Sequence, residues 1–249
     1  MTTWIVTREA SDAEQTAQAL RARGLHARSQ PAIAREALPW PDGLTPRRDA
    51  AGTLVMCTSP YAAHLVIERW PALRAAAGEA PLACAATAPV TAAILEAGGV
   101  PVVVRAQGGV QALAAAIAAT VHGGPRPWVL YPTSDVGEES DEHAAALAAL
   151  SPAADVRRGV AYATRPAPHL ERALADLERD AAVLVFSPSA VDALVTAAAR
   201  AGVALPRSVV CVGASTARAF ERATHREALL VPRGTELASF LASLPETPP

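Results

Sequence analysis

The chain has 249 residues, of which 51% are hydrophobic and 18% are charged, and its formal net charge is −2. This composition indicates a folded globular protein with enough residues for two domains, and it excludes a disordered chain. The near-neutral charge argues against broad binding to nucleic acid or to a membrane surface, so an anionic ligand would need local donors.

Short apolar runs alternate along the chain with longer amphipathic stretches. The predicted strands cover residues 4–6, 27–34, 53–57, 82–86, 102–104, 128–131, 155–162, 183–186, 208–212 and 229–231. The predicted helices cover residues 11–23, 61–70, 89–97, 110–121, 138–150, 189–200, 215–223 and 236–244. Apolar strands that are each followed by a helix are typical of parallel sheets covered on both faces. The predicted fold class is therefore α/β.

The sequence is an internal duplication. The segment around Ser59 recurs around Ser187, which lies 128 residues later. Other landmarks recur at similar offsets: Trp4 as Trp128, Cys84 as Cys211, and Gly108-Gly109 as Gly234. A repeat of this length indicates a duplicated folding unit rather than a solenoid. Two similar parallel-sheet lobes, of flavodoxin-like or Rossmann-like type, would leave a cleft in which we expect the function.

Two proline-rich crossings set the predicted domain boundaries. One covers residues 35–52 and the other residues 160–168, and each follows the second strand of its repeat. Proline at this density stiffens a connection and prevents ordinary helix. We therefore predict interleaved lobes, joined by two strands, with a frayed tail. Lobe 1 takes residues 1–35 plus 165–249, lobe 2 takes residues 36–162, and the tail is 245–249.

Small hydroxyl residues follow several predicted strands. Thr58-Ser59-Pro60 and Ser187-Pro188-Ser189 place a serine at the N-cap and a proline at the first helical position. Serine and proline at these positions are well suited to cap a helix, and capping alone explains their presence as well as a binding role does. The binding alternative uses the free N–H groups of a helix N-terminus, which suit carboxylates or phosphates. Gly213 allows a tight turn before Ser215 and Thr216, and this is the sharpest example.

Three further positions carry possible chemistry. Thr7-Arg8 ends the first strand, and Arg8 either contacts an anion or is a solvated loop residue. Tyr162 ends a strand and either packs in the hinge or turns its hydroxyl toward the cleft. The acidic run from Glu138 to Glu142 suits the start of a helix and does not indicate a catalytic carboxylate pair.

Several kinds of site lack their sequence motif. The chain has no Gly-x-Gly-x-x-Gly after a strand, no Gly-Lys-Ser/Thr and no Gly-x-Ser-x-Gly. Its six histidines are scattered and its three cysteines lack the spacing of metal ligands, so we expect no metal site. The cysteines lie in apolar runs and indicate buried thiols of a reducing compartment. With no signal peptide and no membrane-length apolar run, we expect a cytoplasmic protein without nucleic-acid or membrane partners.

The ordered motifs resemble the uroporphyrinogen-III synthase family over essentially the whole chain. The resemblance is carried by Val6-Thr7-Arg8 with Leu20 and Gly24, by Thr58-Ser59-Pro60-Tyr61-Ala62, by Val160-Ala161-Tyr162-Ala163-Thr164, by Phe186-Ser187-Pro188-Ser189 and by Gly213-Ala214-Ser215-Thr216-Ala217. Each motif alone is weak, whereas their order in a duplicated chain is specific. The family's architecture, two α/β lobes joined by a two-stranded β ladder, agrees with the predicted lobes.

The resemblance implies a cyclising lyase of tetrapyrrole biosynthesis, serving haem, sirohaem or cobalamin. Its substrate would be hydroxymethylbilane, and its products would be uroporphyrinogen III and water. The ring would close with inversion of ring D, through an azafulvene and then a spiro intermediate. The resemblance implies no cofactor and no metal. It also implies that Tyr162 is the general acid. The expected assembly is a monomer, with transient contact to hydroxymethylbilane synthase.

The implied substrate-binding residues are hydroxyl, amide and guanidinium donors near the strand ends. They are Thr7, Arg8, Thr58, Ser59, Thr87, Ser187, Ser189, Gly213, Ser215 and Thr216.

The sequence departs from the family pattern in two places. Ala86 and Pro89 stand where the first repeat usually has the Gly and Thr of Gly-x-x-Thr-Ala, and Thr87 is the nearest replacement. Residues 150–155 lack the usual glycine before the next strand. An alternative that these departures leave open is a diverged intracellular two-lobed binding or regulatory module without cyclase activity.

Overall fold

The computed structural model describes residues 3–177 and 181–231. The predicted helix at 236–244, Gly234 and the predicted frayed tail at 245–249 lie outside these described residues. The chain divides into two compact units, residues 1–35 with 164–249 and residues 36–163. Each is built from parallel strands with helices on both faces, so the predicted α/β class is confirmed.

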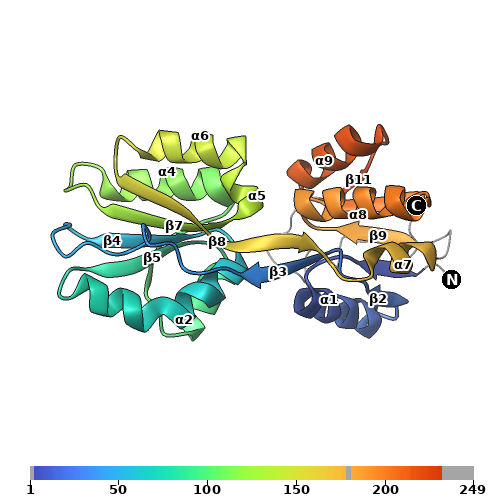
Figure 1. The fold of residues 1–249 in the computed structure, drawn as a ribbon, viewed down its shortest axis with the longest axis horizontal. Coiled ribbons are helices and arrows are strands. Elements are labelled where there is room, and N and C mark those ends of the chain that lie inside the picture. Colours follow the sequence, from blue (N-terminus) through green and yellow to red (C-terminus); the bar gives the residue numbers. More distant parts are fainter. Residues whose placement is uncertain (1–2, 178–180, 232–249) are drawn as a thin grey trace. The chain divides into compact units, whose positions relative to one another are not determined.

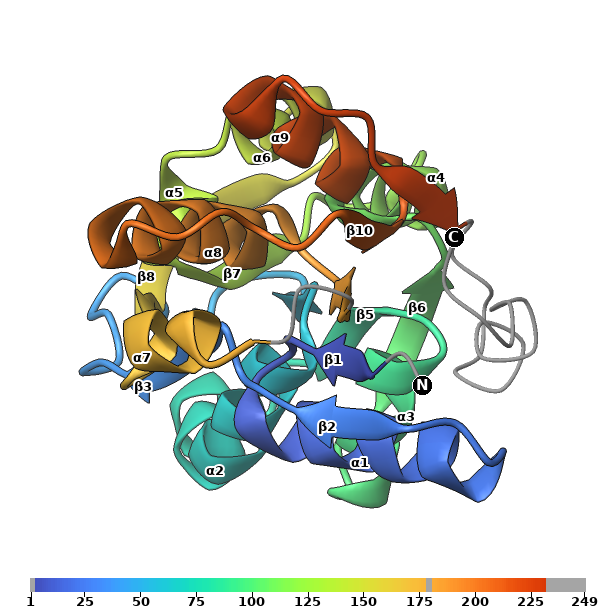
Figure 2. The same ribbon diagram turned by 90° about the vertical axis from the view of Figure 1, so that its right-hand side faces the viewer.

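The first unit is a five-stranded sheet in the order β11-β10-β9-β1-β2. The strand pairings are parallel. Its strands are β1 (Trp4–Val6), β2 (Ala27–Ser29), β9 (Ala182–Val185), β10 (Ser208–Val212) and β11 (Leu229–Val231). Helix α1 (Ala10–Ala22) covers one face, where Trp4, Leu20 and Leu184 share a core. Helices α7 (Leu170–Ala175), α8 (Pro188–Ala201) and α9 (Ala214–Thr224) belong to the core on the other face (Figure 2).

The second unit contains most of a six-stranded sheet in the order β3-β8-β7-β4-β5-β6. The strands are β3 (Ile33–Ala37), β4 (Thr53–Cys57), β5 (Leu82–Thr87), β6 (Val102–Ala106), β7 (Trp128–Ser134) and β8 (Asp155–Pro166). Pairings from β6 across to β8 are parallel. Helices α2 (Pro60–Ala77) and α3 (Val90–Ala97) lie on one face, and α4 (Gly109–Val121) and α6 (Asp141–Leu150) lie on the other, with the short α5 (Asp135–Glu138) before α6 (Figure 1).

The structure corrects the prediction of a single strand at 27–34. Residues 27–29 form β2 beside β1, whereas residues 33–37 form β3 beside β8 in the other sheet. Pro31 lies between them and has no N–H with which to continue a ladder. The chain therefore changes sheets at this point.

Two predicted helices also differ, and one helix was not predicted. The helix predicted at 61–70 continues through Pro71 to Ala77, because proline removes one backbone bond but need not end a helix that packs against a sheet. The helix predicted at 138–150 is two helices, since the Ser140 hydroxyl accepts the N–H of His143 and starts α6 there. Helix α7, of only six residues, was not predicted.

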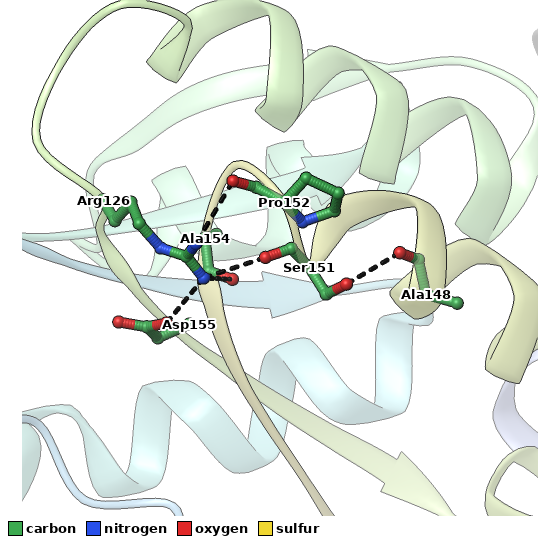
Figure 3. A network of polar contacts seen from close by, with 6 residues as sticks. All are labelled: Arg126, Ala148, Ser151, Pro152, Ala154 and Asp155. Atoms are coloured by element: carbon green, nitrogen blue, oxygen red, sulfur yellow. Dashed lines mark hydrogen bonds and ion pairs between the residues drawn. The ribbon is translucent and has the colours of Figure 1, made fainter.

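An arginine closes the turn that lacks the family's glycine before β8. The Arg126 guanidinium donates to the carbonyl oxygens of Ser151 at 2.9 Å and Ala154 at 3.2 Å, and it pairs with Asp155 at 2.7 Å (Figure 3). A third carbonyl, that of Pro152, accepts at 3.3 Å. Guanidinium has several donors in a fixed plane, so one side chain satisfies the carbonyls that the turn leaves without partners.

All three cysteines are free and buried, as the apolar runs predict. A hydrogen bond with Cys57, followed by burial, raises the pKa of Cys84, and burial raises the pKa of Cys211 to about 11. The thiols of Cys84 and Cys211 are therefore protonated at neutral pH and act as packing groups. Among the described residues, no helix has the length and apolar character needed to cross a membrane.

Candidate functional site

Predicted site residues gather at the carboxyl edge of the sheet in the second unit. Thr58 and Ser59 follow β4, and Thr87 ends β5. Tyr162 does not end a strand as predicted: it lies inside β8, which continues to Pro166, and it is opposite Ser134 at the end of β7. Because these strands run parallel, their carboxyl ends meet at one edge, which is the usual place for ligands in open α/β sheets.

Tyr162 is held at the N-terminus of α2. Its hydroxyl lies 3.0 Å from Oγ of Ser59, and the same oxygen accepts the N–H of Ala62 at 3.1 Å, so Ser59 is the N-cap. The ring packs against Tyr61 at 5.0 Å between centroids, and only 6% of Tyr162 is exposed. The phenol is thus fixed in position, with its oxygen one hydroxyl away from a helix N-terminus.

Thr58 begins a row of polar side chains. Its Oγ1 lies 3.1 Å from the Tyr131 hydroxyl, which in turn lies 2.9 Å from Nδ1 of His143. Tyr131 is fully buried on β7, and burial raises its pKa to about 12. Burial also lowers the pKa of His143, so the imidazole is neutral at neutral pH.

Thr87 is half-buried, and its hydroxyl donates to Oγ1 of Thr91 at 3.0 Å. The adjacent departures from the family pattern are structural. Ala86 is fully buried in β5, and Pro89 occupies the N-cap position of α3 without a side-chain cap bond. The first repeat therefore lacks a hydroxyl where the family's threonine would stand.

In the first unit, Thr7 and Arg8 follow β1. The Thr7 hydroxyl is fully buried and donates to the carbonyl of Leu184 on β9 at 2.6 Å. Arg8 pairs with Asp12 at 2.7 Å, and its guanidinium lies 5.0 Å from the ring centroid of Phe186. Both contacts hold the guanidinium near the start of α1, beside Phe186, the first residue after β9.

Ser187 and Ser189 open helix α8. Oγ of Ser187 accepts the N–H of Ala190 at 3.2 Å and lies 3.1 Å from Oγ of Ser189. Ser187 is thus the counterpart of Ser59: each is the cap of the helix that follows its strand. Ser189 adds a second hydroxyl to the same turn.

Helix α9 begins differently. Its N-cap residue is Gly213, at φ 91° and ψ 152°, and no side chain caps this helix. The Thr216 hydroxyl is buried and lies 3.3 Å from the carbonyl of Val212, whereas Ser215 is half-buried. The first N–H groups of α9 are thus left for a partner outside the helix, together with its partial positive charge.

No group of three or more His, Cys, Asp or Glu side chains within residues 3–177 and 181–231 is arranged to hold a metal ion. The donors at both sheet edges are hydroxyls, backbone amides and one arginine. Such groups bind carboxylates well.

The profile of the family described as uroporphyrinogen-III synthase HemD matches residues 14–241. The chain belongs to this family. It is therefore placed among the cyclising lyases of tetrapyrrole biosynthesis, and the family implies hydroxymethylbilane as the substrate. No curated protein sequence matched the chain.

Solved structures of the family show the same fold. A mutant uroporphyrinogen III synthase from the extreme thermophile Thermus thermophilus is 20% identical, with 97% of this chain and 96% of that chain covered, at a TM-score of 0.59. The uroporphyrinogen-III synthetase of Helicobacter pylori 26695 is 13% identical, with 97% of each chain covered, at a TM-score of 0.63.

Sequence reasoning missed Tyr131 and His143. Tyr131 reads as one more apolar strand residue, and His143 as one of six scattered histidines. The only available signal was that a tyrosine inside a buried strand must find a partner for its hydroxyl. Which partner it finds depends on the packing of α6 against this face of the sheet.

Proposed function

We propose that this chain closes hydroxymethylbilane to uroporphyrinogen III, with inversion of ring D and loss of water, using the carboxyl edges of both sheets. The family match over residues 14–241 carries this proposal. It is supported by the hydroxyls, uncapped helix N–H groups and arginine that lie at those edges, because the substrate carries many carboxylates.

Substrate binding divides into two kinds of contribution. Ser189, Ser215, Arg8 and the N–H groups after Gly213 act as direct donors in the first unit. Thr58, Ser59 and Thr87 supply hydroxyls in the second. The hydroxyls of Thr7 and Thr216 bond to backbone carbonyls, so these residues contribute by holding the turns that present the other donors. Ser187 contributes likewise as the cap of α8.

Tyr162 acts as the general acid. It transfers its phenolic proton to the hydroxymethyl oxygen. Electrons from the pyrrole nitrogen then help to break the C–O bond, so that water departs and the remaining group is an azafulvene. Ring D then attacks this carbon, a spiro intermediate forms, and rearrangement gives the inverted ring. A phenol is a weak acid, with a pKa of about 10, so the position of the proton near the leaving oxygen matters more than its acidity.

The two compact units correspond, in this proposal, to the two lobes of the family's architecture. Strands β3 and β8 would form the two-stranded ladder that joins the lobes, since they are neighbours in the sheet and each contains a unit boundary. We also propose that the enzyme is a cytoplasmic monomer that meets hydroxymethylbilane synthase only transiently, as expected for transfer of an unstable substrate.

An isomer-resolved assay tests the activity. Purified protein is supplied with hydroxymethylbilane, and the oxidised type I and type III products are separated. We expect the type III isomer at a rate far above spontaneous closure. Type I alone, formed at the spontaneous rate, would show that the chain is instead a binding or regulatory module.

The Tyr162→Phe substitution tests the acid. We expect turnover to fall by about ten-fold or more, because general acid catalysis typically contributes 10²–10⁴-fold. The circular dichroism spectrum should be retained, since Ser59 keeps its bond to Ala62. Tyr61→Phe is the matched control, because it removes a hydroxyl from the neighbouring ring and should leave most of the turnover. Unchanged turnover in Tyr162→Phe would remove this residue from the mechanism.

A further inference from the structure

The row Thr58–Tyr131–His143 contains three side chains from three different elements. Thr58 follows β4, Tyr131 lies on β7 and His143 lies in the first turn of α6. The two hydrogen bonds measure 3.1 and 2.9 Å. Gly137 of α5 leaves room for this arrangement, because a Cβ there would collide with Oγ1 of Thr133 and lie 3.1 Å from the imidazole. The row leads from a half-buried histidine to a hydroxyl at the proposed substrate edge.

Counting protons gives the row a direction. The Tyr131 hydroxyl has one proton and three hydrogen-bonding neighbours, the hydroxyls of Thr58 and Thr133 and Nδ1 of His143, so it donates to one of them and can accept from the others. At neutral pH both groups are neutral, since imidazolium has a pKa of about 6.5 and phenol a pKa of about 10. The lone pair of a neutral imidazole nitrogen is a better acceptor than the oxygen of a neutral phenol, so the favoured bond is O–H to Nδ1. The Tyr131 oxygen then accepts the hydroxyl proton of Thr58. That proton points into the protein, and the lone pairs of Thr58 Oγ1 are left as acceptors.

We propose that Tyr131 and His143 are positioning residues that keep Oγ1 of Thr58 as a hydrogen-bond acceptor toward the substrate. The chemical group that such an oxygen recognises is the N–H of a pyrrole ring, not a carboxylate. Thr58 thereby differs from the donors around it and selects the ring backbone of the linear tetrapyrrole. This assignment rests on the proposed function, because it takes hydroxymethylbilane as the ligand.

Protonation of His143 reverses the direction of the two hydrogen bonds in the row. Nδ1–H then donates to Tyr131, Tyr131 donates to Thr58, and the Thr58 proton is released toward the ligand. Burial lowers the pKa of His143, so this happens only below about pH 6.5, the ordinary value for histidine.

The elements around His143 carry several charged and titratable groups. They are Asp141 and Glu142 on α6, Asp135 and Glu138 on α5, Tyr131 on β7 and Arg158 on β8, whereas α4 has no charged residue. Glu142 favours the charged form of His143 and Arg158 opposes it.

The tautomer of His143 is measured directly on the whole protein. Long-range proton–nitrogen NMR of uniformly labelled enzyme, with the signal assigned by its loss in His143→Asn, should show the Nε2–H tautomer at pH 7.5. An Nδ1–H tautomer would overturn the assignment, because Tyr131 would then donate to Thr58. This measurement needs no activity, so it stands even if the proposed function fails.

The kinetic test follows KM for formation of the type III isomer from about pH 8 down to about pH 5.5, a range that extends below the ordinary histidine value of about 6.5 because burial lowers the pKa of His143. For the wild-type chain we expect KM to rise as the pH falls, because Thr58 loses its acceptor role. In His143→Asn the amide oxygen still accepts the hydrogen bond from Tyr131, so KM at pH 7.5 should stay close to that of the wild type. Because the amide does not titrate, the rise of KM at low pH should disappear. His122→Asn, at an exposed histidine after α4, is the matched control and should keep the wild-type profile.

Tyr131→Phe removes the middle of the row. KM at pH 7.5 should rise about three- to ten-fold, the effect of one lost hydrogen bond, while kcat stays near the wild-type value. A wild-type profile in both Tyr131→Phe and His143→Asn would overturn the proposal. If Tyr131→Phe does not fold, His143→Asn decides alone. Absence of the type III isomer with the wild-type chain would instead refute the proposed function.

Discussion

Gly213 shows how one residue separates the two repeats. Its backbone, at φ 91° and ψ 152°, lies in a region that is essentially restricted to glycine. Helix α9 and its counterpart α3 both begin without a side-chain cap, but Pro89 at the N-cap of α3 has no backbone N–H, and Ala86 before it is buried inside β5. The repeats therefore offer different donors after β5 and β10, and we expect the stronger carboxylate contact at α9.

Substitution of Gly213 by alanine tests this backbone requirement. We expect Gly213→Ala to lower the free energy of unfolding by about 1–3 kcal/mol, because a Cβ is strained at this φ and ψ. Urea denaturation measures the change. Gly124→Ala is the control: its φ is not positive, its added Cβ would lie 3.5 Å from the carbonyl of Val121, and its effect should stay within about 0.5 kcal/mol. Equal effects at both positions would contradict the conformational argument.

At the scale of elements, side chains bond to the backbone groups that the ends of helices and a turn leave without a helical partner. Ser59 and Ser187 cap α2 and α8 with bonds of 3.1 and 3.2 Å, which is why both helices begin directly after their strands. Arg126 closes the α6–β8 turn in the absence of a glycine. These contacts set where each helix and strand begins, and so they set the places of the hydroxyls at the site.

Arg126→Ala should lower the free energy of unfolding by about 1 kcal/mol, because it removes charge-assisted bonds to three carbonyls from a solvent-exposed place. Arg126→Lys should recover only part of the loss, since an ammonium cannot reproduce the planar set of donors. Arg69→Ala, on the exposed surface of α2, is the control and should change stability by less than about 0.5 kcal/mol. If Arg126→Lys matches the wild type, the planar geometry is unimportant.

At the scale of the molecule, each unit has its own hydrophobic core. Leu184 belongs to the core of the first unit and Leu130 to that of the second, and both are fully buried. Units with separate cores can open separately. A substitution in one core is therefore expected to leave the protection of the other largely unchanged.

Hydrogen exchange tests this independence. Leu130→Ala and Leu184→Ala should each cost about 2–5 kcal/mol in the unit that contains them. In Leu130→Ala, amides of β4 and β7 should exchange faster while those of β9 and β10 keep wild-type rates, and Leu184→Ala should show the reverse. Faster exchange throughout the chain in both variants would mean that the units unfold as one.

The strands at residues 4–6, 53–57, 208–212 and 229–231 were predicted with the bounds that the structure has. Short apolar runs followed by hydroxyl, glycine or proline residues carry that information locally. The sheet change after Ser29 was not predictable in the same way, because Pro31 indicates a break in the ladder but not that β3 pairs with β8 in another sheet. The roles of the candidate binding residues remain predictions.

The sequence by itself determined the alternation of strands and helices, the caps at Ser59 and Ser187, and the motifs that place the chain in its family. All of these depend on residues within a few positions of one another. Only the tertiary structure decided that Thr7 bonds to Leu184, that Ser59 meets Tyr162, and that Tyr131 meets Thr58 and His143. Most of these partners lie far apart along the chain and meet because parallel strands bring their carboxyl ends to one edge, while His143 reaches Tyr131 because α6 packs on that sheet.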